Sequence, residues 1–408
     1  MAVDVFDFTD LEVFQRDVPY EALAKLRRQM PVYWNPVQGD GPTRGGFWLI
    51  TRHKDIVQVE KDTQVFSSHQ GLTLADAPSS SSGPAWSMVR DGLTHLDPPM
   101  HSAHKKIVAP SFTPRSIARM ENGVREIAAE VIHRARGMRE VDFAEEIALR
   151  FPVAVVLGEV LGIPREDFSK VIYWSDVIAA PSDPSFPRLA GVKVVQDMYR
   201  YALDILASRR RTPQDDVLSM LAHASTAEGA AMSDEMFVRY FWSLITGAFD
   251  TTASAIAGGM LALIQFPGEH ARLLAQPSLL TTAVEEILRW ETPTIYFRRT
   301  ATVDTIFEGK RITRGQRVVM CYASGNRDED VFANPEVFDV GRKPNDHLSF
   351  GYGPHFCLGS SLARMEIRLL FEQIIDCRLQ VKLRGETKRA RSNFQNRIKQ
   401  MPATLSSL

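Results

Sequence analysis

The chain has 408 residues, of which 44% are hydrophobic and 24% are charged, and its formal net charge is −1. This balance is typical of a globular protein with a large core, and it excludes attraction of the whole molecule to nucleic acid or to an anionic membrane. The 3 cysteines show no close metal-finger spacing, which favours a reducing compartment. Residues 1–16 contain several acidic residues and no apolar run, so we expect a cytoplasmic protein without a signal peptide or membrane anchor.

Hydrophobic periodicity predicts a mainly α fold with a minor β part, in a single domain over residues 1–408. Helices are expected at 20–29, 101–110, 115–136, 143–161, 165–178, 190–210, 233–264, 278–291 and 358–376. Short strands are expected at 45–51 and within 299–321. The segments 74–91 and 179–187 are expected to be long loops, which either cover a site or are ordinary surface connections.

Cations lie at the start of the helix expected at 101–110. His101 and Lys105 stand at positions i and i+4, so they share one face of that helix, and they follow the rigid segment Asp97-Pro98-Pro99. Taken singly, each cation has a solvated surface role as its simplest explanation.

The helix expected at 233–264 carries a polar pair in an apolar setting. Its middle is apolar nearly all round, as expected of a helix that crosses the core, and Asp250 and Thr251 follow directly. A buried carboxyl or hydroxyl group is costly unless it finds partners. The pair is therefore either satisfied within the helix or functional.

The helix expected at 278–291 contains opposite charges at close spacing. Glu286 and Arg289 are placed to form an ion pair on one helix face. Pairs of this kind on a surface usually contribute little to stability. The motif carries weight only together with other segments of the chain.

The most informative segment runs from Phe350 to Gly359 and places Cys357 in a glycine-rich turn before an amphipathic helix. The free N–H groups and the positive dipole end of that helix favour a thiolate, which is the form of cysteine that binds metal. Glycines in the turn allow the backbone to approach a flat cofactor closely. For a lone cysteine, however, a structural role in the core is the usual explanation.

The residues around Cys357 change that assessment. Phe350, Gly353, His355, Cys357 and Gly359 match F-x-x-G-x-H-x-C-x-G, the signature of the cytochrome P450 superfamily, which the sequence resembles over nearly its whole length. The resemblance implies the cytochrome P450 fold, with haem b between the long central helix and the helix after the cysteine loop. It also implies that Cys357 is the axial thiolate ligand of the iron, an arrangement that favours O–O cleavage.

The resemblance implies roles for the other motifs. Asp250 and Thr251 match the family's acid–alcohol pair, in which the alcohol hydrogen-bonds the bound dioxygen and the acid helps to deliver protons. Ala248 stands where many relatives have glycine, so a kink in this helix, frequent in relatives, is less expected here. The residues expected to contact the haem or its propionates are Cys357, His355, Arg299, His101, Lys105, Phe350, Gly351, Gly359 and Ala248.

The propionate ligands show a departure from the family pattern. Lys105 replaces an arginine, which keeps the charge but loses the planar fork, so His101 is the better candidate. Arg298 is an alternative to Arg299 as the buried arginine, although the register of the motif favours Arg299.

Other departures lie outside the propionate motif. Glu286, Arg289 and Arg342 match a network behind the haem that has a folding role in the family, with Val340 in place of a common proline. Arg397 stands where relatives often have glycine, and we expect the local turn to differ there.

The expected substrate pocket has a mainly apolar wall. Its candidates are Leu244, Ile245 and Ala248 from the long helix, Thr294, Ile295, Tyr296 and Phe297 after Pro293, and Asn393 and Phe394 near the C-terminus. Ordinary core packing explains each of these residues equally well. Because relatives with similar segments are bacterial hydroxylases, we expect a lipophilic substrate such as a terpenoid, an alkyl or aromatic hydrocarbon, or a steroid.

The sequence thus predicts a monooxygenase that inserts one atom of O2 into a C–H or C=C bond. No glycine-rich dinucleotide motif follows a strand and no reductase segment is fused, so we expect electrons from a separate ferredoxin with its NAD(P)H-dependent reductase. An acidic donor would dock on a basic patch made of Lys105, Lys106, Arg364 and Arg368. The alternatives are a non-catalytic haem sensor or ligand-binding protein, a peroxide-driven peroxygenase and, least favoured, a cysteine hydrolase, for which no orienting third group is found.

Overall fold

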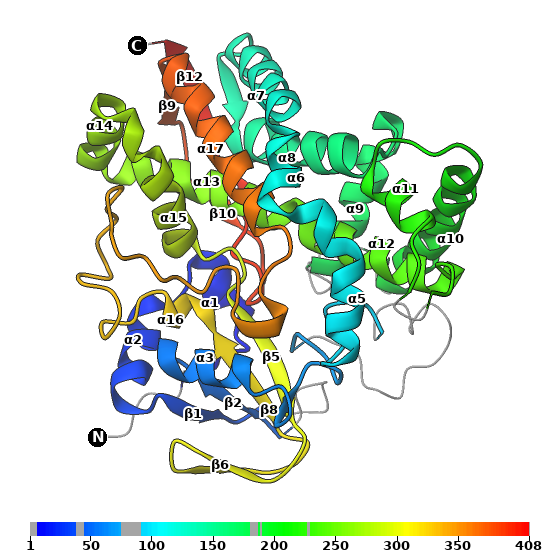
Figure 1. The fold of residues 1–408 in the computed structure, drawn as a ribbon. Coiled ribbons are helices and arrows are strands. Elements are labelled where there is room, and N and C mark those ends of the chain that lie inside the picture. Colours follow the sequence, from blue (N-terminus) through cyan, green and yellow to red (C-terminus); the bar gives the residue numbers. More distant parts are fainter. Residues whose placement is uncertain are drawn as a thin grey trace.

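A computed structural model describes residues 6–37, 45–74, 91–179, 187, 190–226 and 229–407 of the chain. Helices form the larger part of the molecule, and a small mixed sheet lies below them in Figure 1. Most of the loops expected at 74–91 and 179–187 lies outside the described residues.

Helical segments account for most of the described residues. They are α1 (Leu11–Arg16), α2 (Tyr20–Gln29), α3 (His53–Lys61), α5 (Met100–Val108), α6 (Pro114–Ala118), α7 (Glu121–Arg136), α8 (Arg150–Val153), α9 (Phe168–Ala179), α10 (Ala190–Arg211), α11 (Val217–Ala222), α12 (Asp234–Ala248), α13 (Asp250–Gln265), α14 (Pro267–Ala275), α15 (Leu280–Glu291), α16 (Tyr322–Gly325) and α17 (Ser360–Asp376). Short 3-10 turns are η1 (Ala109–Phe112), η4 (Arg165–Asp167), η5 (Pro277–Leu279) and η6 (Gly353–His355), and π turns are η2 (Ala144–Leu149) and η3 (Ala154–Val160).

The strands form separate small sheets. They are β1 (Val32–Asn35), β2 (Phe47–Ile50), β3 (Phe66–Ser67), β4 (Glu140–Asp142), β5 (Tyr296–Ala301), β6 (Thr305–Phe307), β7 (Lys310–Ile312), β8 (Arg317–Cys321), β9 (Leu379–Leu383), β10 (Lys388–Arg389), β11 (Ile398–Gln400) and β12 (Pro402–Ser407). The 5-stranded sheet has the order β1-β2-β8-β5-β3, in which only the β2–β8 pair is parallel. A 3-stranded sheet joins β4, β12 and β9, and β10–β11 and β6–β7 form pairs.

The expected mainly α fold with a minor β part is confirmed, although several element boundaries differ. The helix expected at 115–136 is divided into α6 and α7, and the one expected at 143–161 consists of π turns around α8. The strands expected at 45–51 and within 299–321 are present as β2 and as β5 to β8. The sequence reasoning missed β1, β3, β4 and β9 to β12, because these strands are short and carry weak alternation.

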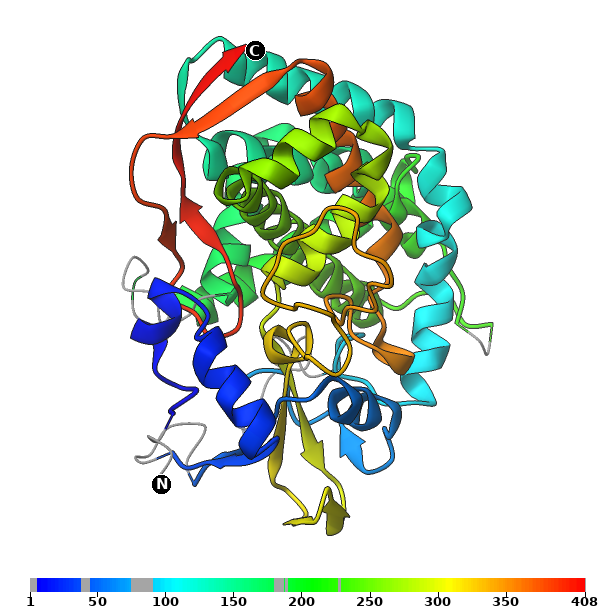
Figure 2. The ribbon, with the colours of Figure 1, turned by 90° about the vertical axis from the view of Figure 1, so that its left-hand side faces the viewer.

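Helix α13 forms the centre of the molecule and is buried along nearly its whole length. Figure 2 shows it surrounded by other helices on several sides. A Cβ atom at Gly258 would lie 2.1 Å from Glu291 Oε2, and one at Gly259 would lie 2.7 Å from Ile287 Cγ2. The paired glycines therefore allow α13 and α15 to pack backbone against side chain.

The segment Asp234–Gln265 is long and apolar enough to cross a membrane by length and composition, but 78% of its most apolar stretch is buried inside the protein. Its position in the core therefore explains its apolar character.

The helix expected to be continuous over 233–264 is interrupted, so that expectation was wrong. Phe249 separates α12 from α13 and has φ −118° and ψ −31°, outside the helical norm. Helical bonding resumes at once, because the Ala253 N–H donates to the Phe249 carbonyl at 2.9 Å. The Thr251 hydroxyl lies 3.4 Å from the Gly247 carbonyl, where it competes with the backbone donor. An alanine at position 248 does not prevent the break.

Candidate functional site

A cavity lies where α5, α12, α13, β5 and the loop before α17 meet. Its walls include every residue that the sequence assigned to haem contact, which are Cys357, His355, Arg299, His101, Lys105, Phe350, Gly351, Gly359 and Ala248. These residues come from segments up to 256 positions apart, from His101 (101) to Cys357 (357). The fold therefore brings the separate motifs of the sequence to one place.

The loop before α17 presents the cysteine to this cavity. The Cys357 N–H donates to the Phe350 carbonyl at 2.9 Å, which closes the turn. Gly351 and Gly353 have φ of 66° and 65°, a left-handed conformation that favours glycine. A Cβ at Gly353 would also lie 3.0 Å from the Glu60 carbonyl of α3. The loop thus requires glycine for its shape and for its close contact with α3.

Helix α17 begins at Ser360, three residues after the cysteine, as the sequence indicated. Cys357 is open to the cavity that it lines, while surrounding protein atoms raise the pKa of its thiol. The backbone N–H of Gly359 and the charges of Lys105 and Arg364 act in the opposite direction and lower that pKa. The donors that favour a thiolate are therefore in place, although burial alone disfavours the charged form.

Basic groups gather at one edge of the cavity. The rings of His101 and His355 lie 4.0 Å apart between centroids, and Arg299 lines the same cavity. Burial, together with charge repulsion from Lys105 and Arg299, lowers the pKa of His101 to about 4. Burial and the same cations depress the pKa of His355 as well. Burial and the neighbouring cations disfavour the protonated form of both histidines, and an anionic ligand would relieve this repulsion.

Lys105 makes a different contact from the one its motif suggested. Its Nζ donates to the carbonyl oxygens of Pro354 and Phe356, each at 2.8 Å. The compact ammonium group of lysine can donate to both carbonyl oxygens, whereas the planar guanidinium of an arginine would donate in a different geometry. Lys105 therefore ties α5 to the cysteine loop in this structure.

The two neighbouring arginines of β5 point in different directions, because successive side chains of a strand alternate. Arg299 faces the cavity, and its Nη2 lies 3.7 Å from Glu60 Oε1. Arg298 instead donates to the carbonyls of Gln70 and Gly71. The structure thus places Arg299, and not Arg298, at the site.

Thr251 and Asp250, the acid–alcohol pair, project from different sides of α13. Thr251 lines the cavity together with Gly247 and Ala248. Asp250 is buried and its Oδ2 accepts a hydrogen bond of 2.5 Å from the Ser175 hydroxyl of α9. Burial raises the pKa of Asp250, and Arg397 opposes that rise.

Only some of the residues expected in the substrate wall line the cavity. Leu244, Ala248, Thr294 and Phe297 line the cavity, whereas Ile245, Ile295, Tyr296 and Phe394 are not among the described residues of its lining. Tyr296 lies on the other face of β5, and its hydroxyl accepts from the Leu74 N–H at 2.8 Å. Phe394 packs on Phe297 with ring centroids 5.5 Å apart, so it supports that wall from behind.

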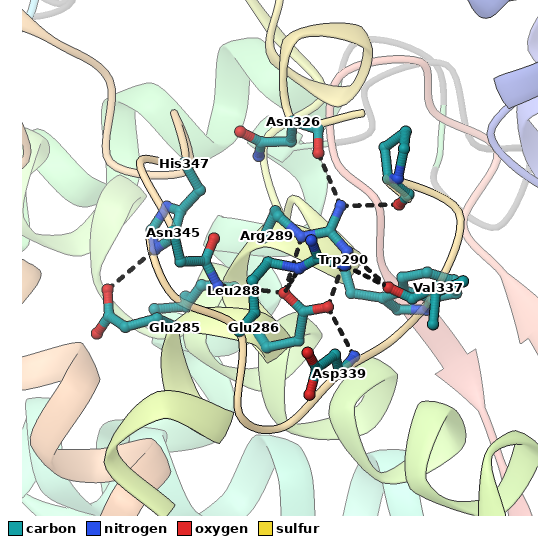
Figure 3. A network of polar contacts seen from close by, with 12 residues as sticks. Glu285, Glu286, Leu288, Arg289, Trp290, Asn326, Val337, Asp339, Asn345 and His347 are labelled. Atoms are coloured by element: carbon teal, nitrogen blue, oxygen red, sulfur yellow. Dashed lines mark hydrogen bonds and ion pairs between the residues drawn. The ribbon is translucent and has the colours of Figure 1, made fainter. Parts of the chain in front are cut away.

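Behind the cavity, the charged network expected from the sequence is formed (Figure 3). Arg289 donates to both Glu286 carboxylate oxygens at 2.8 Å, and Arg342 donates to Glu286 Oε2 at 3.0 Å. The remaining Arg289 donors reach the carbonyls of Asn326, Pro335 and Val337. Glu286 and Arg289 are fully buried, and their hydrogen bonds fix α15 to the loop that precedes the cysteine segment.

Two acidic residues of the cavity wall were missed by the sequence reasoning. Glu60 accepts from the Tyr352 N–H at 2.7 Å and pairs with Arg299. Glu366 of α17 is buried, and burial raises its pKa well above the usual value, while a hydrogen bond from the Thr252 hydroxyl opposes that rise. A charged residue at an apolar position of an otherwise amphipathic helix was the available signal for Glu366.

The residues present fit the haem that the resemblance implies. The thiol of Cys357 lines the cavity and is open to it, so it is the candidate ligand to iron. Arg299 Nε and His101 Nδ1 are buried without a hydrogen-bond partner in the described part of the chain. Carboxylate groups of a bound cofactor would satisfy both.

Comparison with known proteins agrees with this geometry. A family model described as Cytochrome P450 matches residues 269–403. Steroid C26-monooxygenase of Rhodococcus jostii is 35% identical, over 97% of this chain and 83% of that protein. Linalool 8-monooxygenase of Pseudomonas putida is 33% identical, over 98% of each. The solved structure of the Mycobacterium marinum cytochrome P450 CYP268A2 in complex with pseudoionone is 33% identical, with a TM-score of 0.88 over 99% of this chain and 98% of that one.

Proposed function

The chain belongs to the cytochrome P450 family and is a haem-thiolate monooxygenase, and from this premise we propose that it hydroxylates a terpenoid, hydrocarbon or steroid with electrons from a ferredoxin. The observation that supports the proposal best is the single cavity that joins Cys357, the basic edge and the apolar wall.

We assign the cofactor contacts as follows. Cys357 is the thiolate ligand of haem b, and the bound haem supplies the chemistry of O–O cleavage. Arg299, His101 and His355 hold its propionates, because they surround the cavity edge and include unpartnered buried donors among the described residues. Glu286, Arg289 and Arg342 keep the supporting loop in place.

Thr251 and Asp250 divide the handling of protons. The Thr251 hydroxyl makes only a long contact of 3.4 Å to the Gly247 carbonyl, so it is free to hydrogen-bond a ligand in the cavity. Asp250 lies next to it in the chain and supplies the ionisable group that the alcohol lacks. The apolar wall formed by Leu244, Ala248 and Phe297 orients the substrate and excludes water.

The substrate proposal rests on the relatives and on the wall of the cavity. The C26 position of a steroid and the C8 position of linalool are both terminal methyl carbons of a branched isoprenoid chain, and pseudoionone contains such a chain. An apolar wall that includes leucine, alanine and phenylalanine suits the apolar surface of such a chain. Compounds with an isoprenoid chain are therefore the first to test.

The electron donor is proposed to be an acidic ferredoxin that docks on the basic patch Lys105, Lys106, Arg364 and Arg368, in a cytoplasmic setting. The structure leaves Lys106 exposed, whereas Arg364 pairs with Glu285 and Arg368 pairs with Glu121 and Glu372. Lys106 is accordingly the cation whose removal should weaken docking most.

Titration of the purified haem protein with linalool, pseudoionone and cholesterol, each of which carries an isoprenoid chain, tests the proposal. We expect at least one of them to shift the Soret band toward the high-spin form, and the same compound to be hydroxylated with a surrogate ferredoxin, its reductase and NAD(P)H. Spectral binding without turnover would favour a sensor, and turnover only with hydrogen peroxide would favour a peroxygenase.

A further inference from the structure

Arg397 connects the buried acid of the distal helix to the surface. It lies just before β11, and its Nη1 contacts both the Asp176 carboxylate of α9 and Asp250 Oδ1, the latter at 3.1 Å. The exposed fractions of the side chains are 27% for Asp176, 14% for Arg397 and 2% for Asp250. The three charges therefore form a line from the rim of the molecule to the interior.

The contacts direct the Asp250 carboxylate away from the cavity. Gly247, Ala248 and Thr251 line the cavity, whereas Asp250 is not among the described residues of its wall. Its Oδ2 is instead bonded to the Ser175 hydroxyl. In this position the carboxylate faces α9, so it must turn before it can reach the side of the helix that carries the Thr251 hydroxyl.

The hold of Arg397 on Asp250 is the weaker of its two contacts. Arg397 donates a hydrogen bond to Asp176, whereas Asp250 Oδ1 receives no aligned hydrogen bond from any described residue. Because Asp176 remains as a partner, the positive charge of Arg397 stays neutralised when its contact with Asp250 opens. The ion pair is thus suited to opening and closing.

We propose that Arg397 is a positioning residue that holds the Asp250 carboxylate against α9, and that opening of this ion pair sets how fast Asp250 supplies protons to the cavity. The inference rests on the function proposed above. The resemblance to the family implies glycine at this position, so we infer that the arrangement depends on the arginine of this chain.

The surrounding charges determine the sign of the expected pH effect. Asp250 faces Arg397, Asp176 on α9 and, through Arg397, Glu145 on η2. Burial raises the pKa of Asp250, Arg397 lowers it, Asp176 raises it and the Ser175 hydrogen bond lowers it. Removal of the Arg397 charge therefore leaves Asp250 protonated up to a higher pH.

The test compares R397Q and R397K with R389Q in the haem-loaded protein. Arg389 of β10 is a matched control, because it too is 14% exposed and pairs with a buried carboxylate, that of Glu291 on α15. The first readout is an infrared titration without turnover, in which the carboxyl band of Asp250 is identified by its loss in D250N.

We expect the Asp250 band in R397Q to titrate about 1–3 pH units higher than in the parent protein, and in R397K close to the parent value. The second readout is the pH profile of NADH consumption with the surrogate ferredoxin system and linalool, which should shift in the same direction. A band that titrates at the parent pH in R397Q, or that moves equally in R389Q, overturns the proposal. If linalool is not turned over, the infrared titration still decides it independently of the proposed function.

Discussion

The two buried acids Glu286 and Asp250 occupy opposite kinds of environment. Glu286 accepts from Arg289, Arg342, Asn345 and the Asp339 N–H, all within 3.1 Å. Among the described residues, the Asp250 carboxylate accepts one hydrogen bond, from the Ser175 hydroxyl, and makes an ion-pair contact with Arg397 without an aligned hydrogen bond. A fully satisfied buried charge fixes its surroundings, whereas a partly satisfied one can change partners at lower cost. The Glu286 network is therefore suited to supporting the site, and the surroundings of Asp250 are suited to a carboxylate that changes partners.

The largest expected effect concerns the thiol of Cys357, whose loop follows the segment that the Glu286 network holds. C357S should abolish the red-shifted ferrous–CO band completely, because oxygen in place of sulfur removes the thiolate ligand. The absorption spectrum of the reduced, CO-treated protein measures this loss. C377S is the control and should keep the band, since Cys377 lies at the far end of α17. Retention of the band in C357S would falsify the ligand assignment.

The next largest effect tests whether the Glu286 network is structural. R289L leaves the Glu286 charge buried without its bidentate partner, so we expect the free energy of unfolding to fall by about 3–5 kcal/mol. Urea denaturation followed by haem absorbance measures it. R272A removes an ion pair between the exposed side chains of Arg272 on α14 and Asp339, and it should cost less than about 1 kcal/mol. Equal losses in the two variants would contradict the structural role.

Next to Asp250, the substitution T251A should uncouple electron use from product formation. Loss of the hydroxyl removes a hydrogen-bond group from the cavity wall, and we expect product per NADH consumed to fall several-fold while hydrogen peroxide rises. Product and peroxide assays with a turned-over compound provide the measurement. T246A is the control, because the Thr246 hydroxyl bonds the Trp242 carbonyl at 2.9 Å within α12. Unchanged coupling in T251A would remove it from the proton route.

The smallest expected effect is a pH dependence of stability that comes from Glu285, the neighbour of Glu286 on α15. Burial tends to raise the pKa of Glu285, but hydrogen bonds from His347 and Arg364 outweigh it and lower the pKa from 4.5 to about 2. Glu285 therefore stabilises the fold above its ordinary pKa, and that contribution is lost as pH falls toward about 2.

E285Q should accordingly be less stable than the parent at neutral pH, with a difference that shrinks between pH of about 4.5 and about 2. Thermal melting across this range measures the difference. E386Q, at an exposed position, should show no such trend. A stability difference that stays constant down to low pH would contradict the interpretation.

Most of the fold and the identity of the cavity residues could be predicted, because motif residues and helical periodicity depend on local sequence. Cys357, Arg299 and His101 reached one cavity as expected. The orientation of side chains on β5 was less predictable, since the choice between Arg298 and Arg299 depends on the register of the strand.

Contacts made across long sequence separations could not be predicted. The pairing of Arg397 with Asp176 and Asp250 joins segments that no local pattern relates, and the use of Lys105 on loop carbonyls depends on the path of that loop. The break at Phe249 was also missed, because the composition there permits a continuous helix and only the tertiary packing decides.

Strand β5 has a consequence for altering the range of substrates. Phe297 and Arg299 lie on the same face of the strand, so one side chain shapes the apolar wall of the cavity and the other lines its basic edge. Substitution at position 297 can therefore reshape the apolar wall while Arg299 keeps its place in the cavity. Insertion or deletion of a single residue in β5 would turn Arg299 out of the cavity, so libraries at this strand should preserve its length.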